Sequence, residues 1–329
     1  MTILQKQPNK DFIILNLSDP QMNDEDWIDG SVNKDILINT VTTLINRVNP
    51  DLITITGDLA EFGCIRSLYK FTEFIDSFNI PWANVLGNHD NEFDIPVVLD
   101  ALNTKKHSLF EQGDPDLGCG NYIVAIKENE KLITALLMMD THDNIPGTRP
   151  NGEAFMDWGM LIPQQVEWYS NTVNELKQKG CTDTAVFVHI PVFAYREAMN
   201  SAYNIAEKPF LDTTVEDSYG TECWNKGYEE SFGVCWNEWV ASNNADDKML
   251  DAMLNGGTTK HIVCGHDHDN NFVIKHKGIK FIYSTKTGAG HSWVYPLNGG
   301  TVLTVSSNGI ADVRHEYVTV DSDIVNKLS

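Results

Sequence analysis

The sequence lacks the features of membrane, secreted and nucleic-acid-binding proteins. None of its 329 residues belongs to an apolar run of about 18 residues, the length that a membrane-spanning helix needs. The first residues, MTILQKQPNKD, contain no apolar stretch of signal-peptide length, so we expect a cytoplasmic protein unless a leader has been removed. A net charge of −22 would repel a nucleic-acid backbone. We therefore expect neither a membrane nor a nucleic-acid partner.

Cysteine is scarce and follows no redox or metal-binding pattern. The 6 cysteines include no C-x-x-C pair, and a chain of 329 residues has enough core to fold without a disulfide framework. Cys223 and Cys235 share a tryptophan-rich stretch and could form a disulfide in an oxidising compartment. Linkers, repeats and low-complexity segments are also absent, so we expect a single domain over residues 1–329.

Apolar runs alternate with helical patterns in the amino-terminal part of the chain. Runs of strand length cover 12–17, 52–56 and 82–86, and apolar residues at helical spacing cover 33–48 and 65–78. This order favours a parallel βαβαβ unit with right-handed crossovers. Ligands bind outside the carboxyl ends of the strands in such sheets, and a polar motif follows each of these strands.

The rest of the chain contains further strands and helices around one irregular stretch. Residues from about 195 to 240 are aromatic and poorly periodic, and we interpret them as a cap or insertion on the substrate side. The other predicted elements are antiparallel strands at 121–126 and 132–139, a helix at 163–179, a buried strand at 184–188, a short helix at 246–254, a strand at 261–264 and an antiparallel sheet over 272–318.

Two histidines one residue apart follow the strand at 261–264. Gly265 turns the chain, and in an extended segment His266 and His268 can point the same way and reach two different metal ions. An isolated H-x-H can also be a solvated polar loop, so other ligands must come from elsewhere in the chain. Four more predicted strand ends carry the motifs D-P-Q (Asp19, Gln21), G-D (Asp58), G-N-H-D (Asn88, His89, Asp90) and H-I-P (His189).

In this order the five motifs resemble those of the calcineurin-like metallophosphoesterases, which include the purple acid phosphatases. The resemblance covers about residues 12–318, and the stretches at 80–82, 187–191 and 265–272 are most similar to the purple-acid-phosphatase-29 and Dcr2 branch. It implies an α/β (α+β sandwich) fold in which two mixed β-sheets pack face to face, flanked by helices. It also implies a dinuclear metal centre between the carboxyl edges of the sheets.

The resemblance implies two divalent ions, which could be Mn, Fe, Zn or Mg, and a role for each motif. Asp58 bridges the ions, because a carboxylate has two oxygens, and a bridging hydroxide attacks the phosphorus. His89 protonates the leaving group, and Asp90 orients His89. The implied ligands are Asp19, Gln21, Asp58 and His268 for one ion, and Asp58, Asn88, His189 and His266 for the other.

Two positions depart from the family pattern. Gln21 stands where the family usually has the histidine of D-x-H, and its amide oxygen is a weaker and harder ligand that favours Mn or Mg over Zn. Glu61 stands where the purple enzymes have a tyrosine ligand to ferric iron. We therefore expect a looser first site and a protein that is not purple.

Other polar and aromatic residues are weaker candidates. Asp140 and His142 also spell D-x-H after an apolar strand, but their place in the order is wrong, and we interpret them as a loop cap or a distant substrate contact. The remaining candidates are His291 as a substrate contact, Trp224, Trp236 and Trp239 as a pocket wall, and Arg196 and Lys286 as phosphate contacts.

We therefore expect a dinuclear-metal phosphoesterase, and within that class a phosphomonoesterase that acts on a phosphorylated small molecule or a phosphoprotein. Two alternatives stay open at this point. One is a phosphodiesterase acting on a nucleotide or lipid headgroup, and the other is a catalytically weak module that binds phosphate or a phosphoprotein. The sequence does not define the oligomeric state.

Overall fold

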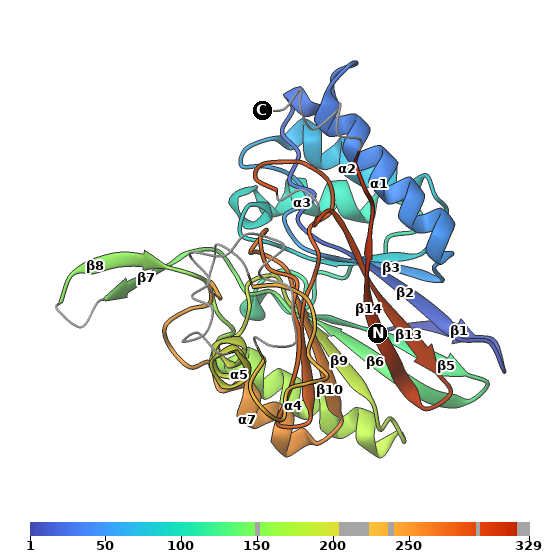
Figure 1. Ribbon diagram of the computed structural model, residues 1–329, viewed down its shortest axis with the longest axis vertical. Coiled ribbons are helices and arrows are strands. Elements are labelled where there is room, and N and C mark those ends of the chain that lie inside the picture. The colour runs from blue at the N-terminus through green and yellow to red at the C-terminus, as the bar shows by residue number, and fades with distance from the viewer. Residues whose placement is uncertain (149–151, 204–223, 236–239, 294–296, 321–329) are drawn as a thin grey trace.

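Two β-sheets pack face to face between two layers of helices (Figure 1). The computed structural model describes all residues except 149–151, 204–223, 236–239, 294–296 and 321–329. This arrangement confirms the predicted sandwich of mixed sheets flanked by helices. Within the described part of the chain, no helix is both long enough and apolar enough to cross a membrane.

The smaller sheet joins the amino-terminal strands to a carboxyl-terminal hairpin, in the order β14-β13-β2-β3-β4. Its strands β2, β3 and β4 are parallel, as the alternating pattern predicts. Strand β13 runs antiparallel to both β2 and β14. The bounds are β2 (Phe12–Leu17), β3 (Leu52–Thr56), β4 (Trp82–Val85), β13 (Gly299–Ser306) and β14 (Gly309–Tyr317).

Helices with one apolar side cover the outer face of the smaller sheet (Figure 1). The first of them begins where the side chain of Ser31 accepts a hydrogen bond from the backbone N–H of Lys34, and it ends where Asn49 adopts a left-handed conformation. The bounds are α1 (Val32–Val48), α2 (Ile65–Asp76) and α3 (Ile95–Asn103), with short 3₁₀ helices η1 (Glu25–Trp27), η2 (Asp90–Glu92) and η3 (Pro115–Leu117).

The larger sheet has seven strands in the order β1-β5-β6-β9-β10-β12-β11. Strands β5 and β6 are antiparallel neighbours as predicted, while β10 is parallel to both β9 and β12. Helices α4, α5 and α7 cover its outer face. The bounds are β1 (Thr2–Lys6), β5 (Tyr122–Glu128), β6 (Lys131–Met138), β9 (Thr184–Phe187), β10 (Thr259–Cys264), β11 (Val273–His276), β12 (Ile279–Tyr283), α4 (Pro163–Gln178), α5 (Ala194–Ala202) and α7 (Met249–Gly256).

The larger sheet buries both faces, because successive side chains of a strand point to opposite sides. In β6, Leu136 and Met138 join the core between the two sheets, whereas Ala135 and Leu137 join the core beneath the helices. All four side chains are fully buried. This explains why the strand reads as a continuous apolar run rather than an alternating one.

Some elements differ from the sequence prediction. The pattern does not predict β1, α3 or the two-stranded arm of β7 (Ile145–Thr148) and β8 (Ala154–Asp157), which projects from the body in Figure 1. Part of the predicted cap is the helix α5, and 204–223 and 236–239 lie outside the described residues. The interpretations made for Cys223, Trp236 and Trp239 therefore also lie outside the described part.

Candidate metal centre

Five strand ends meet on the seam between the two sheets. In the smaller sheet, Asp19, Asp58 and Asn88 follow β2, β3 and β4. In the larger sheet, His189 and His266 follow β9 and β10. Because the carboxyl ends of parallel strands lie at one edge of a sheet, these side chains are brought to a common point although they are far apart in the sequence.

The backbone at the strand ends is strained. Four residues other than glycine adopt positive φ there, namely Asp19 (51°), Gln21 (42°), Asp58 (51°) and His266 (84°). Such conformations are costly for residues with a Cβ, and several of them together are a feature of functional sites. The turns are held together by backbone hydrogen bonds from Asp19 N to Gly57 O (3.2 Å) and from Gln21 N to Asp58 O (2.9 Å).

A glycine makes room for the central carboxylate. Gly87 precedes Asn88, and a Cβ built on it would overlap Oδ1 of Asp58. The same oxygen accepts a hydrogen bond from the backbone N–H of His89 at 3.0 Å. The close approach of the two loops, and not a special turn, explains the glycine of the G-N-H-D motif.

The second of the two implied ligand sets is assembled around His189. Its Nδ1 lies 2.7 Å from the carbonyl oxygen of Thr56 and therefore carries the proton. In the neutral ring, Nε2 presents a lone pair to two acceptors, Oδ1 of Asn88 at 3.0 Å and Oδ2 of Asp58 at 3.4 Å. Nδ1 of His266 lies 3.2 Å from the same nitrogen. A buried group of acceptors that face one another needs a cation among them.

The first of the two implied ligand sets includes His268, Asp19 and Gln21. Nδ1 of His268 pairs with Oγ of Ser292 at 2.7 Å, and its Nε2 lies 3.8 Å from Oδ1 of Asp19. The amide oxygen of Gln21 is buried and has no hydrogen-bond partner. A buried amide oxygen without a hydrogen-bond partner is an acceptor that a bound cation would satisfy.

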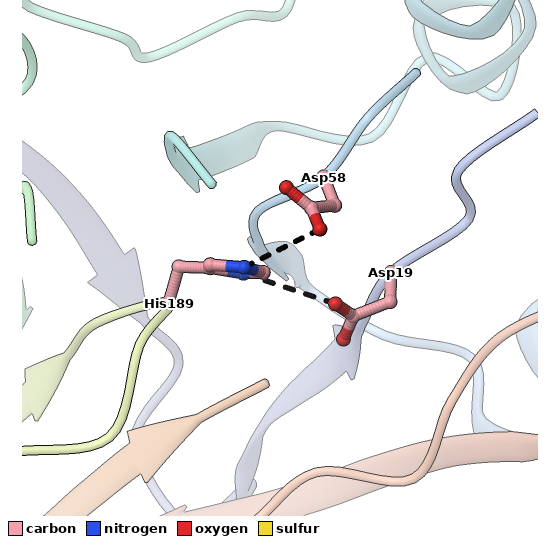
Figure 2. Close-up of side chains that lie close together, drawn as sticks. All are labelled: Asp19, Asp58 and His189. Atoms are coloured by element: carbon pink, nitrogen blue, oxygen red, sulfur yellow. Dashed lines mark ion pairs between the residues drawn. The ribbon is translucent and has the colours of Figure 1, made fainter. Parts of the chain in front are cut away.

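Potential ligand atoms of Asp19, Asp58 and His189 all lie within 4.8 Å of one another. Figure 2 shows the imidazole of His189 pointing between the two carboxylates. Burial opposes a positive charge on His189, but Asp58 and Asp19 outweigh it and raise its pKa to about 10. The electrostatic field of this group therefore favours positive charge, whether a proton or a metal ion.

The other two histidines are in the form that binds metal. Burial, followed by repulsion from His189, lowers the pKa of His266 to about 3. Burial and the ammonium of Lys286 hold the pKa of His268 well below its usual value. Both rings are thus neutral, as a metal-binding imidazole must be. Lys286 itself is buried and donates to the backbone oxygen of Asp19 at 2.5 Å, so it is a structural neighbour of the centre.

The surroundings of His89 differ from the expectation that Asp90 orients its ring. Both oxygens of Asp90 accept backbone hydrogen bonds, from Leu59 and Gly87 at 2.9 Å each. Burial, and then the nearby Asp58, raise the pKa of Asp90 to about 8. The carboxylates beside Nδ1 of His89 belong instead to Glu61 (3.4 Å) and Glu92 (3.8 Å). Asp90 thus ties two loops together, and Glu61 and Glu92 flank the imidazole.

A cavity of about 350 Å³ opens over these side chains. His291 lines it and forms an ion-pair contact with Glu61, with Nδ1 2.9 Å from Oε2. The cavity also reaches Trp158, which no motif marks because it comes from a loop between the predicted elements. The described lining residues are Gln21, Asp58, Asn88, His89, Trp158, Ala241, His266, Asp267, His268, His291 and Ser292.

The weaker candidates lie elsewhere. Nε2 of His142 pairs with Oε1 of Gln165 at 3.0 Å, and Asp140 accepts from the N–H of Cys119, which agrees with a loop cap. Arg196 binds Oδ1 of Asn244 at 2.9 Å. The candidate pocket wall Trp224 packs on Tyr203.

Comparisons with known proteins agree with this geometry. The chain is 25% identical over 277 residues to "Probable inactive purple acid phosphatase 29" of Arabidopsis thaliana, covering 75% of this chain and 62% of that protein. It is 23% identical over 284 residues to "Phosphatase DCR2" of Saccharomyces cerevisiae, covering 79% of this chain and 43% of that protein. The chain thus spans less than two thirds of the length of either relative.

A solved structure shares the fold. The crystal structure of a dimetal phosphatase from Danio rerio superposes with a TM-score of 0.57 at 14% identity, covering 94% of this chain and 98% of that one. Residues 12–270 match the family described as calcineurin-like phosphoesterase. That match includes all five strand ends that meet on the seam, and the chain therefore belongs to the calcineurin-like phosphoesterase family.

Proposed function

We propose that the protein hydrolyses phosphate esters with the help of two divalent metal ions, and that its substrates are monoesters. One observation carries the proposal. Buried nitrogen and oxygen atoms from five strand ends face one another at the floor of a cavity, where Nε2 of His189 lies 3.0 Å from Oδ1 of Asn88 and 3.4 Å from Oδ2 of Asp58. That arrangement is unfavourable without a cation and suits a metal ion.

The residues present fit two ions. The neutral rings of His266 and His268, the amide oxygens of Gln21 and Asn88, and two buried carboxylates form a mixed nitrogen and oxygen donor set. Two divalent ions held there would lower the pKa of a shared water and clamp the phosphoryl oxygens. The proposed ligands are Asp19, Gln21, Asp58 and His268 for one ion, and Asp58, Asn88, His189 and His266 for the other.

His89 is the proposed general acid. It lines the cavity, and two carboxylates occupy the Nδ1 side of its ring. Nε2 is therefore the nitrogen left to deliver a proton to a departing alkoxide. Glu61 and Glu92 take the orienting role in this proposal, because both oxygens of Asp90 are already held by backbone N–H groups.

The cavity supports a small monoester as substrate. Its volume of about 350 Å³ is at the lower end of the range for ligand sites. A small site suits one organic group on the phosphate better than the two of a diester, and a small molecule better than a phosphoprotein. One relative is named "Probable inactive purple acid phosphatase 29", and this supports the second candidate, a module that binds a phosphate group and hydrolyses phosphate esters weakly.

One experiment separates these functions. The protein is loaded in turn with Mn, Fe, Zn and Mg, and bound metal is measured by elemental analysis. The rate of hydrolysis of nitrophenyl phosphate, a monoester, is then compared with that of bis(nitrophenyl) phosphate, a diester. We expect faster turnover of the monoester in the loaded protein. Faster turnover of the diester would establish a phosphodiesterase. Full metal loading without turnover of either ester would argue against both enzymes and favour the phosphate-binding module.

A further inference from the structure

We propose that Trp158 binds a planar ring of the substrate, so that the preferred ester carries an aromatic or heteroaromatic ring close to its ester oxygen. The inference rests on the proposed phosphoesterase function and specifies its substrate class. Among the described residues that line the cavity, Trp158 is the one with a large apolar ring. Nothing in the metal centre requires such a ring at this position.

Trp158 lies beside the metal centre. Its ring makes an edge contact with the ring of His266, with centroids 4.4 Å apart and planes at 82°. His266 is one of the proposed metal ligands, so a group attached next to the reacting phosphate comes within reach of the indole. The tryptophan is partly exposed, and the exposed part borders the cavity.

The backbone around the indole is held by hydrogen bonds at both ends. The N–H of Trp158 donates to Oδ1 of Asp157 at 2.9 Å, and its carbonyl oxygen accepts from the amide of Asn243. The other oxygen of Asp157 accepts two hydrogen bonds from Asn244, at 3.0 and 3.2 Å. A buried carboxylate therefore joins the loop of Trp158 to the loop at 243–244.

The next residue fixes the chain further. Gly159 is buried against the loop at 141–143, where a Cβ would overlap the carbonyl oxygens of Thr141 and Asp143. The backbone that carries the indole is thus packed on one side and hydrogen-bonded on the other. A ring held in this way loses little conformational entropy on binding, which is the property of a recognition surface.

The rest of the lining favours a ring over a second charged group. None of the described residues that line the cavity is lysine or arginine. Histidines are therefore the only basic side chains among these lining residues. Ala241 is the other apolar residue there, and its side chain is small. Stacking or edge contacts between aromatic rings prefer centroid distances of about 4.5–7 Å.

The inference can be tested with two phosphonates that cannot be hydrolysed. Phenylphosphonate and ethylphosphonate share the anionic group and differ in the ring. Their binding to the manganese-loaded protein is measured by calorimetry for the parent, Trp158→Leu and Trp158→Phe, with Trp168→Leu as a control on helix α4. We expect the parent to bind phenylphosphonate about 2- to 10-fold more tightly than ethylphosphonate. Trp158→Leu should bring the ratio of the two affinities close to one. Trp158→Phe and Trp168→Leu should leave this ratio as it is in the parent.

The possible outcomes separate this inference from the proposed function. Equal ratios in the parent and in Trp158→Leu, together with turnover of phenyl phosphate, would overturn the role of Trp158 and leave the phosphoesterase intact. A loaded protein that binds neither phosphonate and hydrolyses no ester would overturn both. Trp158 could instead strengthen the binding of a nucleoside 5′-monophosphate and not that of phenylphosphonate. The substrate ring would then lie farther from the phosphate, and this result would contradict the proposal.

Discussion

Nε2 of His189 lies 3.4 Å from Oδ2 of Asp58, and the two residues reach this position from different sheets. Asp58 follows the middle strand of the βαβαβ unit, and His189 follows β9 of the larger sheet. Their contact therefore depends on the packing of the sheets and not on local sequence. The centre should form only when the sandwich is complete.

The position of Asp58 predicts that its loss affects both ions. Asp58→Asn should reduce bound metal from about two ions per chain to less than one, because Asp58 belongs to both proposed ligand sets. Asp19→Asn should remove about one ion, since Asp19 belongs to the first set only. Elemental analysis after reconstitution measures this, with the exposed Asp29→Asn as a control. Equal losses from the two buried substitutions would argue against a bridging Asp58.

Gln21 sets the affinity of the first site in our assignment. Its unpaired buried oxygen is a hard ligand, so Gln21→His should tighten metal binding at that site and shift the preference toward Zn. Competitive titration of the metal-free protein with Zn and Mn measures both effects. Unchanged affinity and selectivity would mean that the side chain of Gln21 does not bind the metal.

The convergence of these side chains was predictable because the motifs follow apolar strands and keep a fixed order along the chain. Asp58 and His266 are examples, since a glycine stands directly before each of them in the sequence. The environment of His89 was not predictable in the same way. Asp90 is its neighbour in sequence, but the carboxylate of Glu61 reaches it from the turn after β3.

One of the missed elements, the arm of β7 and β8, has a local sequence that argues against its structure. Strand β7 contains Pro146 and Gly147, which strand patterns exclude, and it pairs with β8. Trp158 follows directly after that arm, so its place in the cavity depends on a loop whose path the sequence does not show. The signal that could have drawn attention to it is the pair Trp158-Gly159 just before helix α4.

His315 should make the fold sensitive to acid. Burial lowers the pKa of His315 to about 4. Its Nδ1 pairs with Oγ1 of Thr301 at 3.0 Å, and its Nε2 contacts the carbonyl oxygen of Asn271. The unfolded chain takes up a proton at about pH 6.5 and the folded chain only near pH 4. The contribution of His315 to the free energy of unfolding is therefore complete above pH 6.5 and is lost as the pH falls toward 4.

His315→Gln should remove this part of the acid sensitivity, because glutamine can still donate to Asn271 but does not titrate. Between pH 7 and pH 4.5 the free energy of unfolding of the parent should fall by about 2–3 kcal/mol more than that of the variant. Urea unfolding at both pH values, at the same metal content, measures the difference. Parallel losses in the two proteins would show that His315 titrates normally in the folded state.

The proposed role of His89 depends on the leaving group. If His89 protonates a departing alkoxide, His89→Ala should slow hydrolysis of an alkyl phosphate by about 10²–10⁴-fold. The same change should slow hydrolysis of nitrophenyl phosphate much less, because nitrophenolate departs without a proton. Bound metal should stay near that of the parent, since His89 belongs to neither ligand set.

Two further variants complete the test of His89. His266→Ala should lose metal and activity toward both esters, because Nδ1 of His266 lies 3.2 Å from Nε2 of His189 within the second ligand set. Glu61→Gln should follow the pattern of His89→Ala with a smaller effect, because it removes the charge 3.4 Å from the imidazole and keeps the size of the side chain. Rates on both esters are measured at saturating metal. If His89→Ala loses metal or slows both esters equally, His89 is a ligand or a binding residue, and His291 becomes the next candidate for the acid.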